Sequence, residues 1–183
     1  MKSALHYDFY RLIGCEPTIK GYIKALWIPG FRYLFILRLI QSSQIKFVTS
    51  FLKLILRHYQ FKFGYQIHPS TKIGRGFIIS HYGTIIINSN AIIGENCNVN
   101  AGVIIGSAGR DNKKGVPKLS DRVWVGSNAI IVGGVTIGND TLIAPGTFVN
   151  RDIPDHSLAF GNPCIVKYKK YASKDYISHV YKT

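Results

Sequence analysis

The chain has 183 residues, of which 46% are hydrophobic and 17% are charged, and its formal net charge at pH 7 is +14. This composition excludes a disordered chain, and the length suffices for one domain with an appendage. The three cysteines (Cys15, Cys97 and Cys164) are odd in number and widely spaced. They argue against a disulfide framework and against a zinc site, so no metal is expected. The first residues lack the apolar run and cleavage site of a signal peptide, which predicts a cytoplasmic protein.

Residues 1–63 are predicted to form a basic, amphipathic helical region. They carry ten Lys or Arg residues against two acids. Residues 31–40 and 47–59 have helical patterns, and charges interrupt both before a membrane-spanning length accumulates. In the second of these helices four apolar residues fall close to one face: Phe47, Phe51, Leu54 and Ile55.

Two interpretations of this basic region stay open. Residues 21–63 either pack on the rest of the protein or on a partner subunit, or they lie on the anionic inner face of the plasma membrane. Nucleic acid is not an expected partner, because the chain has no helix-turn-helix, zinc finger or aromatic RNA-binding motif.

From Ile67 onward an aliphatic residue recurs every six positions. The series slips by two residues after Ile85 and is interrupted again after Ile105. Its members are Ile67, Ile73, Ile79, Ile85, Ile93, Val99, Ile105, Leu119, Val125, Ile131, Ile137, Ile143 and Val149. A period of six fits neither a helix nor an ordinary strand. It predicts short strands joined by tight turns, with three such units forming one coil of a triangular prism and about four coils stacking over residues 67–150.

The predicted organisation is therefore mainly β. An N-terminal α-helical region (residues 1–63) precedes a parallel β-helix of hexapeptide repeats (residues 64–166), and a basic C-terminal tail (residues 167–183) follows. The glycine-rich, basic residues 106–118 cannot continue the strand pattern and should protrude as a loop. This loop is either a tolerated insertion or a flap over a functional site.

The repeat resembles the left-handed β-helix acyltransferase superfamily, and at closer range its serine acetyltransferase branch. The segments that carry the resemblance are Ile67-His68-Pro69-Ser70-Thr71-Lys72-Ile73-Gly74, Ser80-His81-Tyr82-Gly83-Thr84, Pro117-Lys118 and Gly161-Asn162-Pro163. The resemblance covers about residues 66–166. It implies a homotrimer, acetyl-CoA as the donor co-substrate with no bound cofactor, and active sites between neighbouring subunits.

By this resemblance His81 is the catalytic residue. An imidazole titrates near neutral pH and can take the proton of an acceptor hydroxyl as its oxygen attacks the thioester. Four further residues are candidates for orienting His81 or contacting the acceptor: Gln66, Ser80, Tyr82 and Asn88. The resemblance also implies an acetyl-CoA site lined by Gly106, Ser107, Lys118, Ser127, Asn128, Ala129, Ala144, Pro145 and Lys167.

The chain departs from serine acetyltransferases at the positions that surround their substrate. Gln66 and Ser80 stand where that branch has aspartates, and Gly115 and Val116 stand where it has an arginine and a histidine. A zwitterionic acceptor would lack its charged partners there.

The stretch Ser80-His81-Tyr82-Gly83-Thr84-Ile85-Ile86-Ile87-Asn88 and the short, basic, aromatic N-terminal region resemble the O-acetyltransferases of capsule, exopolysaccharide and O-antigen gene clusters. Together with the departures from serine acetyltransferases, this resemblance implies an O-acetyltransferase that acts on a sugar hydroxyl, carried for example by a lipid-linked precursor at the inner leaflet. One alternative is a serine O-acetyltransferase of cysteine biosynthesis, and another is a non-catalytic β-helix binding scaffold.

Overall fold

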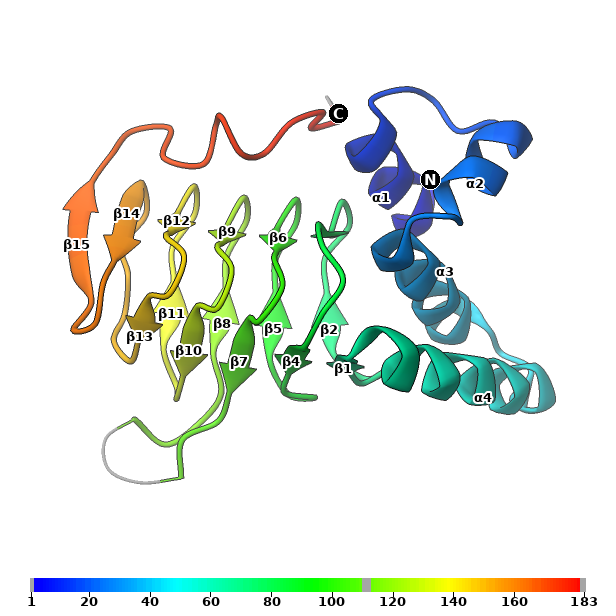
Figure 1. Ribbon diagram of the computed structural model, residues 1–183, viewed down its shortest axis with the longest axis horizontal. Coiled ribbons are helices and arrows are strands. Elements are labelled where there is room, and N and C mark those ends of the chain that lie inside the picture. Colours follow the sequence, from blue (N-terminus) through cyan, green and yellow to red (C-terminus); the bar gives the residue numbers. More distant parts are fainter. Residues whose placement is uncertain (1, 110–112, 182–183) are drawn as a thin grey trace.

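The computed structural model describes residues 2–109 and 113–181, and it places a helical region at one end of a long β-helix (Figure 1). The helices are α1 (Ala4–Ile13), α2 (Ile19–Ala25), α3 (Pro29–Ser42) and α4 (Lys46–Phe63). Pro29 opens α3 at a position where its missing N–H costs no hydrogen bond. Among the described residues, no helix has the length and hydropathy that a membrane crossing requires.

Three parallel sheets form the faces of the prism. Sheet A holds β1 (Tyr65–Ile67), β4 (Ile85–Ile87), β7 (Ile104–Gly106), β10 (Ile130–Val132) and β13 (Phe148–Val149). Sheet B holds β2 (Lys72–Ile73), β5 (Ile92–Ile93), β8 (Lys118–Leu119) and β11 (Thr136–Ile137). Sheet C holds β3 (Ile78–Ile79), β6 (Asn98–Val99), β9 (Trp124–Val125), β12 (Leu142–Ile143), β14 (Ser157–Phe160) and the antiparallel β15 (Ile165–Tyr168).

This architecture confirms the predicted β-helix with an N-terminal helical region. The aliphatic side chains of the repeat fill the prism, and all thirteen are buried. The coils exceed the predicted four, because β13, a bridge at Ile153 and β14 build a further one. The loop predicted over residues 106–118 leaves the prism between β7 and β8, although Gly106 and Lys118 still belong to these two strands and residues 110–112 lie outside the described residues.

The predicted position of the two-residue slip is wrong. Strand pairing aligns Ile67 with Ile87 and Ile87 with Ile105, so Ile87 rather than Ile85 belongs to the stacked column. Ile85 is a second inward residue of β4, paired with Tyr65. The two extra residues therefore lie before Ile85, in the turn that contains His81.

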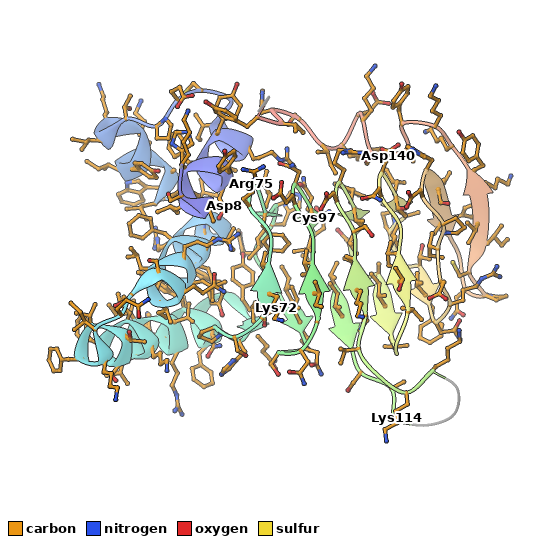
Figure 2. All side chains as sticks on the ribbon, turned by 180° about the vertical axis from the view of Figure 1, so that it is seen from behind. Asp8, Lys72, Arg75, Cys97, Lys114 and Asp140 are labelled. Atoms are coloured by element: carbon orange, nitrogen blue, oxygen red, sulfur yellow. The ribbon has the colours of Figure 1, made fainter. Side chains whose placement is uncertain are left out.

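Close contacts fix the helical region to the first coil. A Cβ on Gly30 would lie 2.3 Å from the carbonyl oxygen of Ile79, so α3 approaches β3 at a distance that only glycine allows. On α1, the buried carboxylate of Asp8 pairs with Arg38 of α3 at 2.8 Å and accepts a hydrogen bond from the Phe77 amide. Figure 2 shows Asp8 at this boundary between the helices and the first coil.

Helix α4 is apolar on two opposite faces. The face that packs on the body carries Leu52, Leu56, Tyr59 and Phe63. Three of the residues predicted to share one face (Phe47, Phe51 and Leu54) lie on the other side and are exposed. The predicted amphipathic face is therefore not the face that joins the helix to the prism.

The C-terminal segment (residues 169–181) returns along the prism to α1 (Figure 1), where the Tyr181 hydroxyl contacts the Lys2 ammonium group. Asp140, which Figure 2 shows beneath this segment, holds it near the last coils. Asp140 accepts hydrogen bonds from the amide and hydroxyl of Ser173, and its other oxygen lies 2.8 Å from Nδ1 of His156. Further along, the ring of Tyr176 packs against Trp124 at a centroid distance of 4.6 Å, tilted by 45°.

Acid should release this segment. Burial raises the pKa of Asp140, but the hydrogen bonds from Ser173 and His156 outweigh burial and hold it below its usual value. A carboxylate with a lowered folded pKa contributes stability above its unfolded pKa and loses it as pH falls through the folded pKa, here below about pH 4. We expect Trp124 fluorescence, measured in a Trp27→Phe background, to change in that range. An Asp140→Asn variant should lack this acid transition.

Candidate active site

His81 lies in the turn that joins sheet C to sheet A in the first coil. This turn spans residues 80–84, and its register makes it two residues longer than the equivalent turns of the coils that follow. His81 is exposed on it. Gly83 has a φ of +135°, which an L side chain rarely adopts, so a glycine is required to close the longer turn.

The helical region holds the His81 turn in place. The Gly83 amide donates to the carbonyl of Phe63 at 3.2 Å, and the Ile85 amide donates to the carbonyl of Gly64 at 3.0 Å. The turn is therefore pinned to the junction between α4 and β1. A functional side chain on a loop needs such support to keep its geometry.

Tyr65 is a positioning residue that the sequence analysis missed. Its hydroxyl donates to the carbonyl oxygen of His81 at 3.3 Å. Its ring packs edge-on against Tyr33 at 5.3 Å, and the Tyr33 hydroxyl donates to the carbonyl of Ile67 at 2.7 Å. Burial raises the pKa of Tyr65 and raises the pKa of Tyr33 to about 12, so both phenols stay protonated donors at neutral pH. The sequence pattern that could have predicted this role is an aromatic residue two positions before Ile67, which alternation along a strand places on the inward face.

A Tyr65→Phe variant tests this role. We expect the fall in kcat to be up to about tenfold, because a small displacement of a catalytic group is costly. The loss of one hydrogen bond should lower the free energy of unfolding by about 1 kcal/mol. Steady-state kinetics and thermal melting would measure the two effects. An unchanged kcat would show that the Tyr65 hydroxyl does not position His81.

The candidates for orienting His81 or contacting the acceptor are only partly brought together. Ser80 and Tyr82 flank His81 in the turn and are exposed. Gln66 points outward from the middle of β1, two residues beyond the Gly64 carbonyl that anchors the turn. Asn88 lies beyond the other end of β4, where its Oδ1 accepts from the Asn90 amide at 2.9 Å. The structure does not bring Asn88 to His81.

Several residues expected to bind acetyl-CoA lie on the same corner of the prism as His81. The turns of successive coils stack there, with the Asn128 amide donating to Ala101 at 2.9 Å and the Gly146 amide donating to Ser127 at 2.8 Å. We call this stack the C–A corner. Its members among the predicted donor-site residues are Ser127, Asn128, Ala129, Ala144 and Pro145.

The other residues expected to bind acetyl-CoA lie elsewhere on the same chain. Gly106 ends β7 and Ser107 starts the protruding loop, on the corner where sheet A passes to sheet B. Lys118 points outward from β8 on sheet B. Lys167 is on β15, with its Nζ 5.6 Å from the centroid of the Phe160 ring.

The protruding loop is braced at its base. Ala108 and Gly115 exchange two backbone hydrogen bonds of 3.0 and 3.1 Å. The Gly134 amide of the next coil donates to the Lys113 carbonyl at 2.9 Å. Lys114 lies on this loop, away from the coils (Figure 2). Within the described part of the chain, no cluster of three or more His, Cys, Asp or Glu side chains could hold a metal ion.

Together, the hexapeptide prism and an exposed histidine in a longer, supported turn define an acyltransferase of the hexapeptide class. The family described as bacterial transferase hexapeptide (six repeats) matches residues 117–151. A serine acetyltransferase of Helicobacter pylori is 31% identical over 162 residues, which cover 86% of this chain and 93% of that protein. The chain therefore belongs to the serine acetyltransferase family.

Two further comparisons agree in family and fold. A serine acetyltransferase of Synechococcus elongatus is 28% identical over 180 residues, or 98% of this chain and 74% of that protein. The crystal structure of serine acetyltransferase from Brucella abortus in complex with coenzyme A has a TM-score of 0.75 and 22% identity, covering 91% of this chain and 67% of that one. The expected enzyme class, an acetyl-CoA-dependent acyltransferase, is confirmed.

The comparisons overturn the expected acceptor. A sugar hydroxyl of a surface polysaccharide, lipid-linked or not, was inferred from four uncharged positions, Gln66, Ser80, Gly115 and Val116, and from the resemblance to O-acetyltransferases of polysaccharide gene clusters. The relatives are serine acetyltransferases, and one of them matches nearly its full length. Four local differences carry less weight than a match over both the helical region and the prism. The saccharide prediction was therefore wrong.

Proposed function

We propose that this protein transfers the acetyl group of acetyl-CoA to the hydroxyl of L-serine, with His81 as general base. The observation that carries the proposal is the 31% identity to a serine acetyltransferase over 93% of that relative's length. It is supported by the exposed position of His81 on a turn that the helical region holds in place.

The proposed reaction needs one proton acceptor and a donor for the oxyanion. The neutral imidazole of His81 takes the proton of the serine hydroxyl, and the serine oxygen attacks the thioester carbonyl. The tetrahedral oxyanion is stabilised by a hydrogen-bond donor, for which the backbone amides of the C–A corner are candidates. The carbon–sulfur bond then breaks, and the His81 imidazolium returns its proton to the sulfur of coenzyme A.

We propose that the enzyme acts as a homotrimer. The residues expected to bind acetyl-CoA lie on two different corners of one prism, at the C–A corner and near Gly106 and Lys118. Three prisms packed side by side would bring one such corner next to the other corner of a neighbouring copy. Two groups that are far apart in one chain would then line a single groove.

The uncharged positions around the site make a quantitative prediction about serine. Gln66, Ser80, Gly115 and Val116 offer no charge to the ammonium or carboxylate of the substrate. Each charge-assisted hydrogen bond is worth about 1.5–3 kcal/mol, so we expect a KM for serine well above that of a site with charged partners. Ethanolamine and 3-hydroxypropionate each lack one charge of serine. Their kcat/KM relative to that of serine should therefore fall less in this enzyme than in an enzyme whose site has charged partners for serine.

The test is thiol release from acetyl-CoA with L-serine, D-serine, ethanolamine and 3-hydroxypropionate measured in parallel. Saturable turnover that is fastest with L-serine, with O-acetylserine identified by mass spectrometry, would support the proposal. Hydrolysis of acetyl-CoA at a rate independent of all four acceptors would overturn it.

A further inference from the structure

Two helices expose large apolar side chains away from the β-helix core. We call these residues the outer helix surface: Ile19, Ile23 and Trp27 in and after α2, and Phe47, Phe51, Leu54 and Phe61 on α4. Phe47 is 83% exposed and Trp27 is 78% exposed. Single exposed apolar residues are common, but Phe47, Phe51, Leu54 and Phe61 gather on one helix and mark an interaction surface, to which α2 adds a second, separate set.

The residues on α4 form one stripe. Phe47, Phe51 and Leu54 follow one another at helical spacings of four and three residues, on the side of α4 opposite to buried Leu56. On α2, Ile19 and Ile23 are also four residues apart. Both α2 and the beginning of α4 lie at the end of the molecule opposite to β15 (Figure 1). The outer helix surface and the last coils of the prism therefore lie at opposite ends of the molecule.

The charges around this surface have one sign. From Pro17 to Gly94 the sequence has no aspartate or glutamate. The exposed charged side chains of the two helices are Lys20, Lys24, Lys46, Lys53, Arg57 and Lys62. The two acids of the N-terminal region precede α2 and are already paired, Asp8 with Arg38 and Glu16 with Lys2.

The exposed apolar side chains and the basic residues around them together indicate which kind of partner binds the outer helix surface. A second copy of the same surface would bring lysines against lysines without any acid to oppose them. An anionic bilayer satisfies both features, because aromatic and aliphatic side chains enter the interface while lysine and arginine contact the headgroups. We propose that the outer helix surface binds peripherally to membranes that contain anionic lipid.

The first experiment is sedimentation of the full chain with vesicles of phosphatidylcholine alone and of phosphatidylcholine mixed with phosphatidylglycerol. Binding should require the anionic lipid and should weaken on raising the salt from about 0.1 M to 1 M, where the screening length falls to about 3 Å. Trp27 gives a second readout, since the other tryptophan, Trp124, is packed against Tyr176 on the prism. Its emission should shift to shorter wavelength on binding.

Two variants separate the apolar and the electrostatic contributions. A triple variant with Phe47→Ser, Phe51→Ser and Leu54→Ser should abolish the sedimentation. A triple variant with Lys46→Gln, Lys53→Gln and Arg57→Gln should weaken binding by about 100-fold, at about fivefold for each charge removed. All six side chains are exposed, and circular dichroism would confirm that the helices remain.

A matched control removes the same charge from elsewhere. Lys167, Lys169 and Lys170 are exposed near the other end of the molecule, and their triple change to glutamine should leave vesicle binding within about twofold of the wild type. Equal losses in this control would mean that net charge alone drives the binding, and the proposal would be wrong. The proposal would also be wrong if no vesicle bound the protein and the triple variant Phe47→Ser, Phe51→Ser and Leu54→Ser instead had a lower molar mass in solution than the wild type. The outer helix surface would then join copies of the chain.

Discussion

Replacing His81 by alanine is expected to lower kcat for acetyl transfer by about 10²–10⁴-fold, the usual contribution of a general base. His81 is exposed on its turn, and the turn is held by backbone hydrogen bonds of Gly83 and Ile85, so the change should leave the fold intact. Steady-state thiol release would measure the loss, and the melting temperature should stay within about 2 °C of the wild type.

His68 provides the matched control for this variant. It is also exposed on a turn, but its Nδ1 accepts the Ser70 amide at 3.1 Å and lies 2.7 Å from the Ser70 hydroxyl, which marks it as a turn-forming residue. We expect His68→Ala to retain most of the activity and to lose a little stability. If His81→Ala kept more than about a tenth of the wild-type kcat, another group would have to be the base.

Removing the Asp8 carboxylate should cause the largest loss of stability. Asp8→Ala leaves the Arg38 guanidinium buried without its anion and leaves the Phe77 amide without its acceptor. Breaking a buried pair in this way costs about 3–5 kcal/mol, which for a chain of this size is a fall in melting temperature of about 10 °C. Chemical denaturation followed by circular dichroism would measure it.

A partly exposed ion pair serves as the comparison. Arg75 and Glu95 lie 2.9 Å apart with side chains that remain 35% and 41% exposed, so Glu95→Ala should cost less than about 1 kcal/mol. A double variant with Asp8→Leu and Arg38→Met replaces the buried pair by apolar groups and should recover much of the loss. Equal destabilisation by Asp8→Ala and Glu95→Ala would contradict the view that the buried pair holds α1 to the body.

The prism was predictable because its core obeys a period. Each inward position repeats the same environment, so Ile, Val or Leu is required there in every coil. The misplaced slip had a physical cause: Ile85 and Ile87 are both inward residues of β4, and the sequence alone could not tell which of them stacks on Ile105. That ambiguity hid the longer turn around His81.

The parts that escaped prediction depend on contacts between distant segments. Arg11 donates from α1 to the carbonyl of Gly76 and to the side chain of Asn98. No pattern in the sequence predicts hydrogen bonds between segments so far apart. Tyr65 was overlooked because its role depends on which coil stacks above it. The acceptor was misjudged because the absence of charge at a few positions says what a site lacks and does not say what it binds.

The return of residues 169–181 to α1 changes how the molecule is expected to unfold. In an open stack each coil touches only its neighbours, so the terminal coils can fray one at a time. Here Arg11 also donates to the carbonyl of Ser178, and Tyr181 packs edge-on against Tyr10, so the last part of the chain holds the first. Loss of either end then removes support from the other. The prism should unfold in a single cooperative transition. Its folding should be slow, because the entropy of closing the long loop between the chain ends is lost before the contacts between them can stabilise the fold.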